Sequence, residues 1–138
     1  MFMLKKGEII KINIVDYAFG GKGIGRVNDD KTIVFIKDGI PGQIVNARIT
    51  KKKQNYAEAS ITEVIQKSNL QKHHNYQPIS GAPYIELSIE DQKKMKQQVC
   101  FEVFQKIGKI NNPENYFDQW ISSPESYHYR NKMEYSFL

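Results

Sequence analysis

The chain has 138 residues, 40% of them hydrophobic and 25% charged, a composition that suits a folded globular protein and excludes a wholly disordered one. No run approaches the roughly 18 consecutive apolar residues of a membrane-spanning helix, and residues 1–11 lack the pattern of a secretory signal. The single cysteine, Cys100, excludes an internal disulfide and a multi-cysteine metal site. We therefore expect a cytoplasmic protein without a membrane partner.

The formal net charge of +5 is concentrated in the first half of the chain. Residues 1–66 contain 11 Lys and Arg against 7 Asp and Glu, whereas residues 67–138 contain 9 against 8. A positive field of this kind suits an anionic partner, and nucleic acid is the commonest one. A solvated lysine-rich surface explains the same charge, so composition alone leaves both interpretations open.

Residues 1–66 predict a β domain. Apolar and polar residues alternate with the period of two of a half-buried strand, and clusters of Gly, Asn, Asp and Pro separate the runs. A sheet this small covers its edges by closing, so we predict a small five-stranded antiparallel barrel. Its strands are predicted at 8–15, 24–27, 32–36, 43–50 and 56–65. Its candidate core residues are Ile10, Ile12, Ile14, Val34, Ile36, Val45, Ala47 and Ile49.

The second half of the chain predicts a linker at 67–87, which is polar and contains Pro78 and Pro83, followed by a unit at 88–138. Ser88 and Asp91 form an approximate capping box at the start of a helix that Gly108 ends. The helix carries an amphipathic stripe of apolar residues at a spacing of four. The members of that stripe are Met95, Val99, Val103 and Ile107, flanked by Cys100 and Phe104.

Residues 111–126 predict a loop, and residues 127–138 predict a terminal strand that stops without a turn or cap. We therefore expect that the chain was cut from a longer protein. An unpaired strand edge is a template for pairing with another copy, so we expect any oligomer to form through this strand. The fold class expected for the whole chain is mostly β with one helix.

A glycine-rich run at 19–26 resembles a phosphate-binding loop only superficially. A Walker loop feeds a helix whose N-terminal amides hold the phosphates, whereas these glycines precede a predicted strand. The simpler interpretation is that they allow a sharp link between two strands. Bare backbone amides in such a link also reach phosphates, so a contact with nucleic acid is compatible with both interpretations.

A basic turn lies between the last two predicted strands, at Lys51, Lys52 and Lys53, with Tyr56 close behind. Lysines attract phosphates and release counterions, and an aromatic ring offers a stacking platform for an unpaired base. The alternative is a solvated turn whose lysines protect a sheet edge. The combination of basic and aromatic residues favours contact with RNA.

Two other features carry no chemistry of their own. His73 and His74 have no cysteine or suitably spaced carboxylate beside them, so exposed histidines are favoured over a metal site. Cys100 has no neighbouring base in the sequence and lies on the apolar stripe, which predicts a buried thiol and not a nucleophile.

Residues 6–66 resemble the TRAM domain, an RNA-binding module with an OB-like barrel. The match rests on the run Ala18-Phe19-Gly20-Gly21-Lys22-Gly23-Ile24-Gly25-Arg26, the turn Ile40-Pro41-Gly42 and Lys51-Lys52-Lys53 before Tyr56-Ala57-Glu58-Ala59. Further on, Gln92, Lys96 and Val99 and the segment Tyr129-Arg130-Asn131-Lys132 resemble RNA (uracil-5-)-methyltransferases. RNA is then the expected partner. The candidate contact residues are Phe19, Lys22, Arg26, Arg48, Lys51, Lys52, Lys53 and Tyr56.

The resemblance has two departures. Many members of the family bind an iron–sulfur cluster through cysteines at positions that fall here on His73, Ile79 and Ala82, so no cluster and no metal are expected. The family's S-adenosylmethionine site, catalytic cysteine and glutamate base all belong to a domain beyond Leu138. The resemblance thus implies an RNA-binding piece of an enzyme, without catalysis of its own.

TRAM-bearing members of the family methylate mainly ribosomal RNA. The resemblance therefore implies ribosomal RNA, 23S rRNA in particular, and not tRNA as the substrate of the parent enzyme. The alternative is a stand-alone RNA-binding module, associated with ribosomes or acting as an RNA chaperone. The terminal segment favours the enzyme, because such a module has no need of it.

Overall fold

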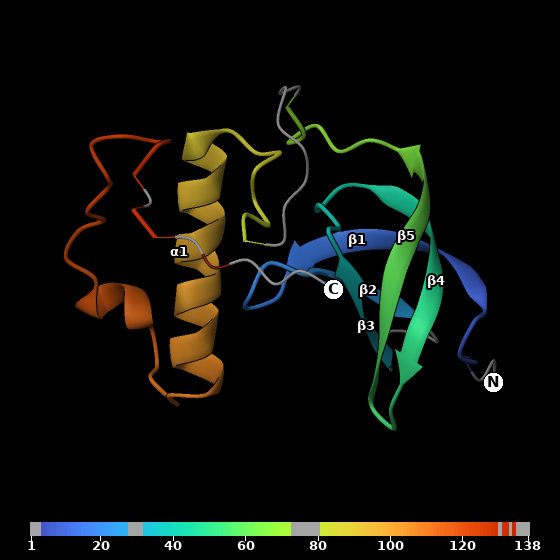
Figure 1. The fold of residues 1–138 in the computed structure, drawn as a ribbon. Coiled ribbons are helices and arrows are strands. Elements are labelled where there is room, and N and C mark those ends of the chain that lie inside the picture. Colours follow the sequence, from blue (N-terminus) through green and yellow to red (C-terminus); the bar gives the residue numbers. More distant parts are fainter. Residues whose placement is uncertain (1–3, 28–31, 73–80, 130, 133, 135–138) are drawn as a thin grey trace.

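The computed structural model describes residues 4–27, 32–72, 81–129, 131, 132 and 134. It places a β-barrel beside one long helix, α1 (Ile89–Lys106), and a short 3₁₀ turn, η1 (Pro113–Tyr116), lies on the far side of that helix (Figure 1). The mostly β fold with one α-helix is therefore confirmed for the described part of the chain. No helix within it is long and apolar enough to cross a membrane.

The barrel is closed and contains the five predicted strands in the spatial order β1-β2-β3-β5-β4. Each strand agrees with its predicted range to within two residues at either end, because the period-two pattern marks the buried face directly. The run of Asn and Asp at 28–30, which separates the second predicted strand from the third, lies outside the described residues. The strands are β1 (Ile9–Tyr17), β2 (Gly23–Val27), β3 (Thr32–Lys37), β4 (Ile44–Lys52) and β5 (Tyr56–Gln66).

The prediction that all strands run antiparallel was wrong, because β3 and β5 pair in parallel. The other four pairs are antiparallel. Directions must alternate around an antiparallel barrel, and an odd number of strands cannot alternate when the ring closes. One pair must therefore run parallel, and here that pair sets Ile33 beside Tyr56 and Phe35 beside Glu58.

The barrel interior is filled by the inward-facing residues of all five strands. Ile14, Val34, Ile36, Val45 and Ala47 are wholly buried, and Ile12 and Ile49 nearly so. Of the predicted core residues, Ile10 alone is only partly buried, although it packs against the cluster. Alternation thus predicted the core well.

A second apolar cluster joins the barrel to α1. Tyr17 and Ile40 enter it from the barrel, Leu87 from the segment before the helix, and Val99 from the helix itself. Tyr84 packs edge-to-face on Tyr17, with ring centroids 5.0 Å apart. Leu70, Tyr84 and Leu87, which fall in the range predicted as a linker, therefore contribute to a core between barrel and helix.

The helix begins as predicted, with the Ser88 side chain accepting a hydrogen bond from the N–H of Asp91. It ends at Lys106, and the N–H of Gly108 bonds back to the Val103 carbonyl. The stripe is narrower than predicted, because only Val99 is fully buried on this helix. Cys100 is exposed, so the prediction of a buried thiol was wrong. One residue advances about 100° around a helix, which turns Cys100 away from the line of Val99.

The predicted terminal strand is not formed by its described residues, 127–129, 131, 132 and 134, none of which is in a strand. A strand needs a ladder partner, and the closed barrel offers it no free edge. The remaining residues of 127–138 lie outside the described part. The region predicted as a loop, 111–126, contains η1 and otherwise no helix or strand.

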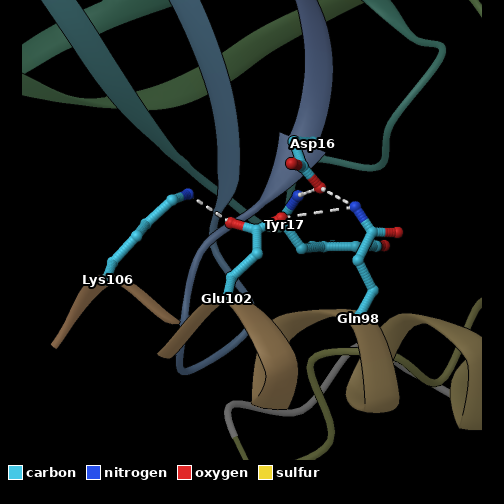
Figure 2. Close-up of polar contacts among 5 residues, drawn as sticks. All are labelled: Asp16, Tyr17, Gln98, Glu102 and Lys106. Atoms are coloured by element: carbon cyan, nitrogen blue, oxygen red, sulfur yellow. Dashed lines mark hydrogen bonds and ion pairs between the residues drawn. The ribbon is translucent and has the colours of Figure 1, made fainter. Parts of the chain in front are cut away.

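Hydrogen bonds and an ion pair lie at the edge of the junction between the barrel and α1 (Figure 2). The Asp16 carboxylate accepts hydrogen bonds from the N–H of Tyr17 at 2.7 Å and from Gln98 Nε2 at 3.4 Å. Gln98 also donates to Glu102, which pairs with Lys106 one turn further along α1. The contact thus sets two carboxyl groups, one from each side of the junction, close together.

The two carboxyl groups respond in opposite ways. Burial raises the pKa of Asp16, the charge of Glu102 adds to the rise, and the Tyr17 N–H opposes it. The pKa of Glu102 is lowered, chiefly by the hydrogen bond from Lys106. Glu102 therefore keeps its charge here, and Asp16 is the group whose ionisation the junction disfavours.

Replacing Asp16 with Asn keeps an oxygen acceptor for Tyr17 and Gln98 and removes the ionisation. A pKa raised by folding means that the stabilising contribution of Asp16 is present below its unfolded pKa and is lost as pH rises through its folded pKa. The D16N chain should therefore be more stable than the original at neutral pH. The difference should disappear below about pH 3.9, the ordinary aspartate pKa.

Urea unfolding at both pH values measures this difference. The matched control is Asp118→Asn, which removes the same charge at an exposed position after η1. If D16N were destabilised equally at both pH values, the conclusion that the junction disfavours the ionised form of Asp16 would be wrong.

Candidate nucleic-acid interface

The glycine loop, residues 18–22, connects β1 to β2 at the end of the barrel nearest α1. Gly20 and Gly21 both have positive φ, 88° and 85°, which an L side chain rarely adopts. A Cβ on Gly21 would lie only 2.6 Å from the Cβ of Pro83. Glycine is therefore required at this position both by the backbone conformation and by the close approach of the segment before the helix.

Glu58, on β5, contacts one lysine of the glycine loop and one lysine of the neighbouring strand β4. One carboxylate oxygen lies 2.9 Å from Lys22 Nζ and the other 3.5 Å from Lys51 Nζ. The hydrogen bond from Lys22 is the main reason that the pKa of Glu58 is lowered. Two lysines predicted to contact nucleic acid, 29 positions apart in sequence, thus converge on one acidic residue.

An aromatic pair lies on the outer face of the barrel beside these charges. Phe35 on β3 and Tyr56 on β5 contact edge-to-face, with centroids 5.7 Å apart, and both are half-buried. Arg26, Ile33 and Tyr56 are successive partners across β2, β3 and β5, so the exposed Arg26 lies on the same outer face. Cationic and aromatic groups on one face are what a single-stranded nucleic acid requires.

The turn between β4 and β5 carries the rest of the predicted basic tip. The Lys52 ammonium bends back onto the Lys53 carbonyl, and the Lys53 N–H closes the turn on the Tyr56 carbonyl at 2.9 Å. Lys53 itself is exposed. The tip lysines therefore share one end of the barrel with the Phe35–Tyr56 pair.

Two predicted contact residues lie apart from this group. Arg48 is exposed on β4 and donates to the Gly7 carbonyl at 3.2 Å, towards the start of the chain. Phe19, which is 82% exposed, faces the helix side of the glycine loop. The structure thus divides the predicted residues into one basic and aromatic face, defined by Lys22, Arg26, Lys51, Lys52, Lys53 and Tyr56, and two outlying positions.

Sequence reasoning missed two members of this face. Phe35 is absent from the candidate contact residues, although its alternation with Val34 and Ile36 places it outside the barrel. Glu58 belongs to the residues that carry the TRAM resemblance but is not among the candidate contact residues, because an acidic residue is not expected in a basic interface. Its position two residues after Tyr56, on the same strand face, was the available signal.

The described His, Cys, Asp and Glu side chains give little support to a metal site. Among the described residues, no three His, Cys, Asp or Glu side chains are grouped to hold a metal ion. An iron–sulfur cluster usually requires four thiolates, and the sequence has one cysteine, so its residues do not fit such a cluster. His73, His74 and Ile79 lie outside the described residues.

The role of Lys22 can be tested through the Glu58 carboxyl. Replacing Lys22 with Met removes the group that chiefly lowers the Glu58 pKa, so this pKa should rise towards its ordinary value of about 4.3. Carbon-13 NMR titration of the carboxyl group measures it. Lys53→Met is the control and should leave the Glu58 pKa in place. An unchanged pKa in K22M would show that the ion pair is absent in solution.

A family model for the TRAM domain matches residues 4–62. Proteins described as uncharacterised RNA methyltransferases align with almost the whole chain. The protein from Caldanaerobacter subterraneus subsp. tengcongensis is 36% identical, over 97% of this chain and 29% of its own length. Its counterpart from Clostridium tetani is 34% identical with the same coverage, and that from Aquifex aeolicus is 27% identical over 94% of this chain and 30% of its own.

Among solved structures, a conserved protein of Methanococcus maripaludis is 29% identical, with a TM-score of 0.40. The match covers 43% of this chain and 81% of that protein. The chain spans 29% of the length of the first two curated relatives. Residues 4–62 are therefore a TRAM domain, in a chain that corresponds to the N-terminal part of this family of RNA methyltransferases.

Proposed function

We propose that this chain is the RNA-binding part of an S-adenosylmethionine-dependent RNA (uracil-5-)-methyltransferase that acts on 23S rRNA in the cytoplasm. The observation that carries the proposal is the basic and aromatic face of the TRAM barrel. The relatives are described as RNA methyltransferases, which supports RNA as the ligand of that face. The barrel binds the RNA strand, and the chemistry takes place elsewhere in the enzyme.

The geometry of the face explains how it would hold RNA. Lys51, Lys52 and Lys53 project charge from the end of the barrel, where phosphates can approach without desolvating the core. The Phe35–Tyr56 pair next to them offers a ring face to an unpaired base. Glu58 holds Lys22 and Lys51 in position, which reduces the entropy that either side chain would lose on binding a phosphate.

Methyl transfer is assigned to residues outside this chain. S-adenosylmethionine supplies the methyl group in such a reaction, and a cysteine nucleophile adds to the uracil ring. The sole cysteine of the sequence, Cys100, lies on α1 beside apolar groups and Lys96, and the described residues that line the adjoining groove include no carboxylate or histidine. It therefore lacks the neighbouring base that this chemistry needs.

The RNA-binding half of the proposal is tested by replacing Lys51, Lys52 and Lys53 together with Ala. Affinity for RNA should fall for all sequences alike, because phosphate contacts carry no base information. The slope of log affinity against log salt should flatten by up to about 0.7 for each phosphate of a single strand that the protein no longer neutralises. Fluorescence anisotropy with labelled rRNA fragments at several salt concentrations measures both quantities.

The charge-matched control replaces Lys93, Lys94 and Lys106 on α1 with Ala. It removes the same net charge from a different surface and should leave the salt slope within error of the original. Equal losses in the two triple variants would show that net charge, and not the tip, attracts the RNA.

The catalytic half is tested with radiolabelled methyl donor and unmodified ribosomal RNA. The 138-residue chain alone should transfer no methyl groups, whereas a chain of the relatives' full length should do so. Transfer by the 138-residue chain that is lost in Cys100→Ala would place catalysis in this fragment and overturn the assignment. Specific RNA binding with no transfer by the longer chain would instead favour a binding module that is not an enzyme.

A further inference from the structure

A groove of about 380 Å³ lies between the glycine loop and α1, outside the basic and aromatic face described above. Phe19 and Gly20 form one wall, Tyr84 and its neighbour Pro83 the second, and Val99, Cys100 and Phe104 of the helix the third. A volume of this size lies within the range of about 300–1,000 Å³ typical of pockets for small organic ligands. The walls come from three separate segments, so the groove exists only once the helix docks on the barrel.

The walls are aromatic and incompletely covered. The Phe19 side chain is 82% exposed and that of Phe104 48% exposed, although both line the groove. Tyr84 packs edge-to-face on the buried Tyr17. An aromatic side chain has only two torsions to order, so it loses little conformational entropy when a flat group stacks on it.

The charge of the groove points to an anionic ligand. Of the described residues that line it, the one charged side chain is Lys96, whose ammonium lies 5.6 Å from the centroid of the Tyr84 ring. Lys22, about half exposed, belongs to the same glycine loop as Phe19. A flat apolar slot with ammonium groups at its margin fits a nucleobase whose phosphates stay in solvent, and it offers no acidic partner to a basic peptide.

We propose that this groove binds an unpaired nucleobase of the RNA, stacked against Phe19, with its flanking phosphate towards Lys96. The inference rests on the proposed RNA-binding function and adds a second contact to it. The strand would pass from the basic tip along Lys51, Glu58 and Lys22 to the glycine loop, because these side chains form a connected series of contacts. Barrel and helix would then read one strand together.

The single cysteine of the chain makes the proposal directly testable. Cys100 is exposed and lines the groove, so the rate at which a small thiol reagent modifies it reports on whether the groove is occupied. Saturating oligouridine of about 12 nucleotides should slow the modification of the 138-residue chain at least several-fold. An abasic strand of equal length carries the same phosphates without bases, and it should leave the rate unchanged at saturation.

A pair of matched variants tests the stacking wall. Phe19→Ala should weaken binding of the oligouridine by about 5- to 150-fold, the range for loss of one stacked base, without changing the salt slope. Tyr116→Ala, which removes an aromatic ring of similar exposure from η1, should leave the affinity unchanged. The circular dichroism spectrum of each variant confirms that its fold is intact.

The outcomes separate this inference from the proposed function. Tight, salt-dependent binding of oligouridine with an unchanged Cys100 rate would retain the RNA-binding function and overturn the groove. Protection by the abasic strand as strong as by oligouridine would also overturn it, because phosphates alone would then account for the effect. Failure of any RNA to bind would overturn the proposed function itself.

Discussion

Closure of an odd-stranded barrel is the constraint on which the rest of this structure depends. Five strands leave no free edge, and the closure forces one parallel pair, β3 with β5. Parallel pairing brings the starts of these two strands to the same end of the barrel. Phe35, Tyr56 and Glu58 are consequently neighbours, and the glycine loop can reach them through Lys22. The candidate interface is therefore a product of topology as much as of composition.

The elements of the barrel were predictable because they are local. Alternation identified Ile12, Ile14 and the other inward residues without any knowledge of pairing, and Ser88 with Asp91 marked the start of α1. Pairings between distant strands leave no comparable local signal. Turn residues show where one strand ends and the next begins, but not whether the two strands pair. The consecutive strands β3 and β4 are not neighbours in the barrel, and nothing near β3 indicates that its second neighbour is β5.

The same distinction between local signals and long-range contacts applies to the candidate site. Lysines and exposed aromatics can be selected by residue type, which is why the tip and the glycine loop were identified. Contacts between them, such as Glu58 with Lys22 and Lys51, depend on the barrel being closed. The groove beside α1 was beyond prediction, because its barrel and helix walls come from segments far apart in the sequence and because the helical stripe suggested that Cys100 is buried.

The spatial order of the strands also determines when the barrel can be completed during synthesis. The first four strands form an open sheet in the order β3-β2-β1-β4, and β5, the last to be made, fills the seam between β3 and β4. Until residue 66 has left the ribosome, two strand edges remain unpaired and open to wrong partners. The last strand to be synthesised therefore closes the barrel. Any pause in translation before β5 prolongs the state in which the edges of β3 and β4 are unpaired.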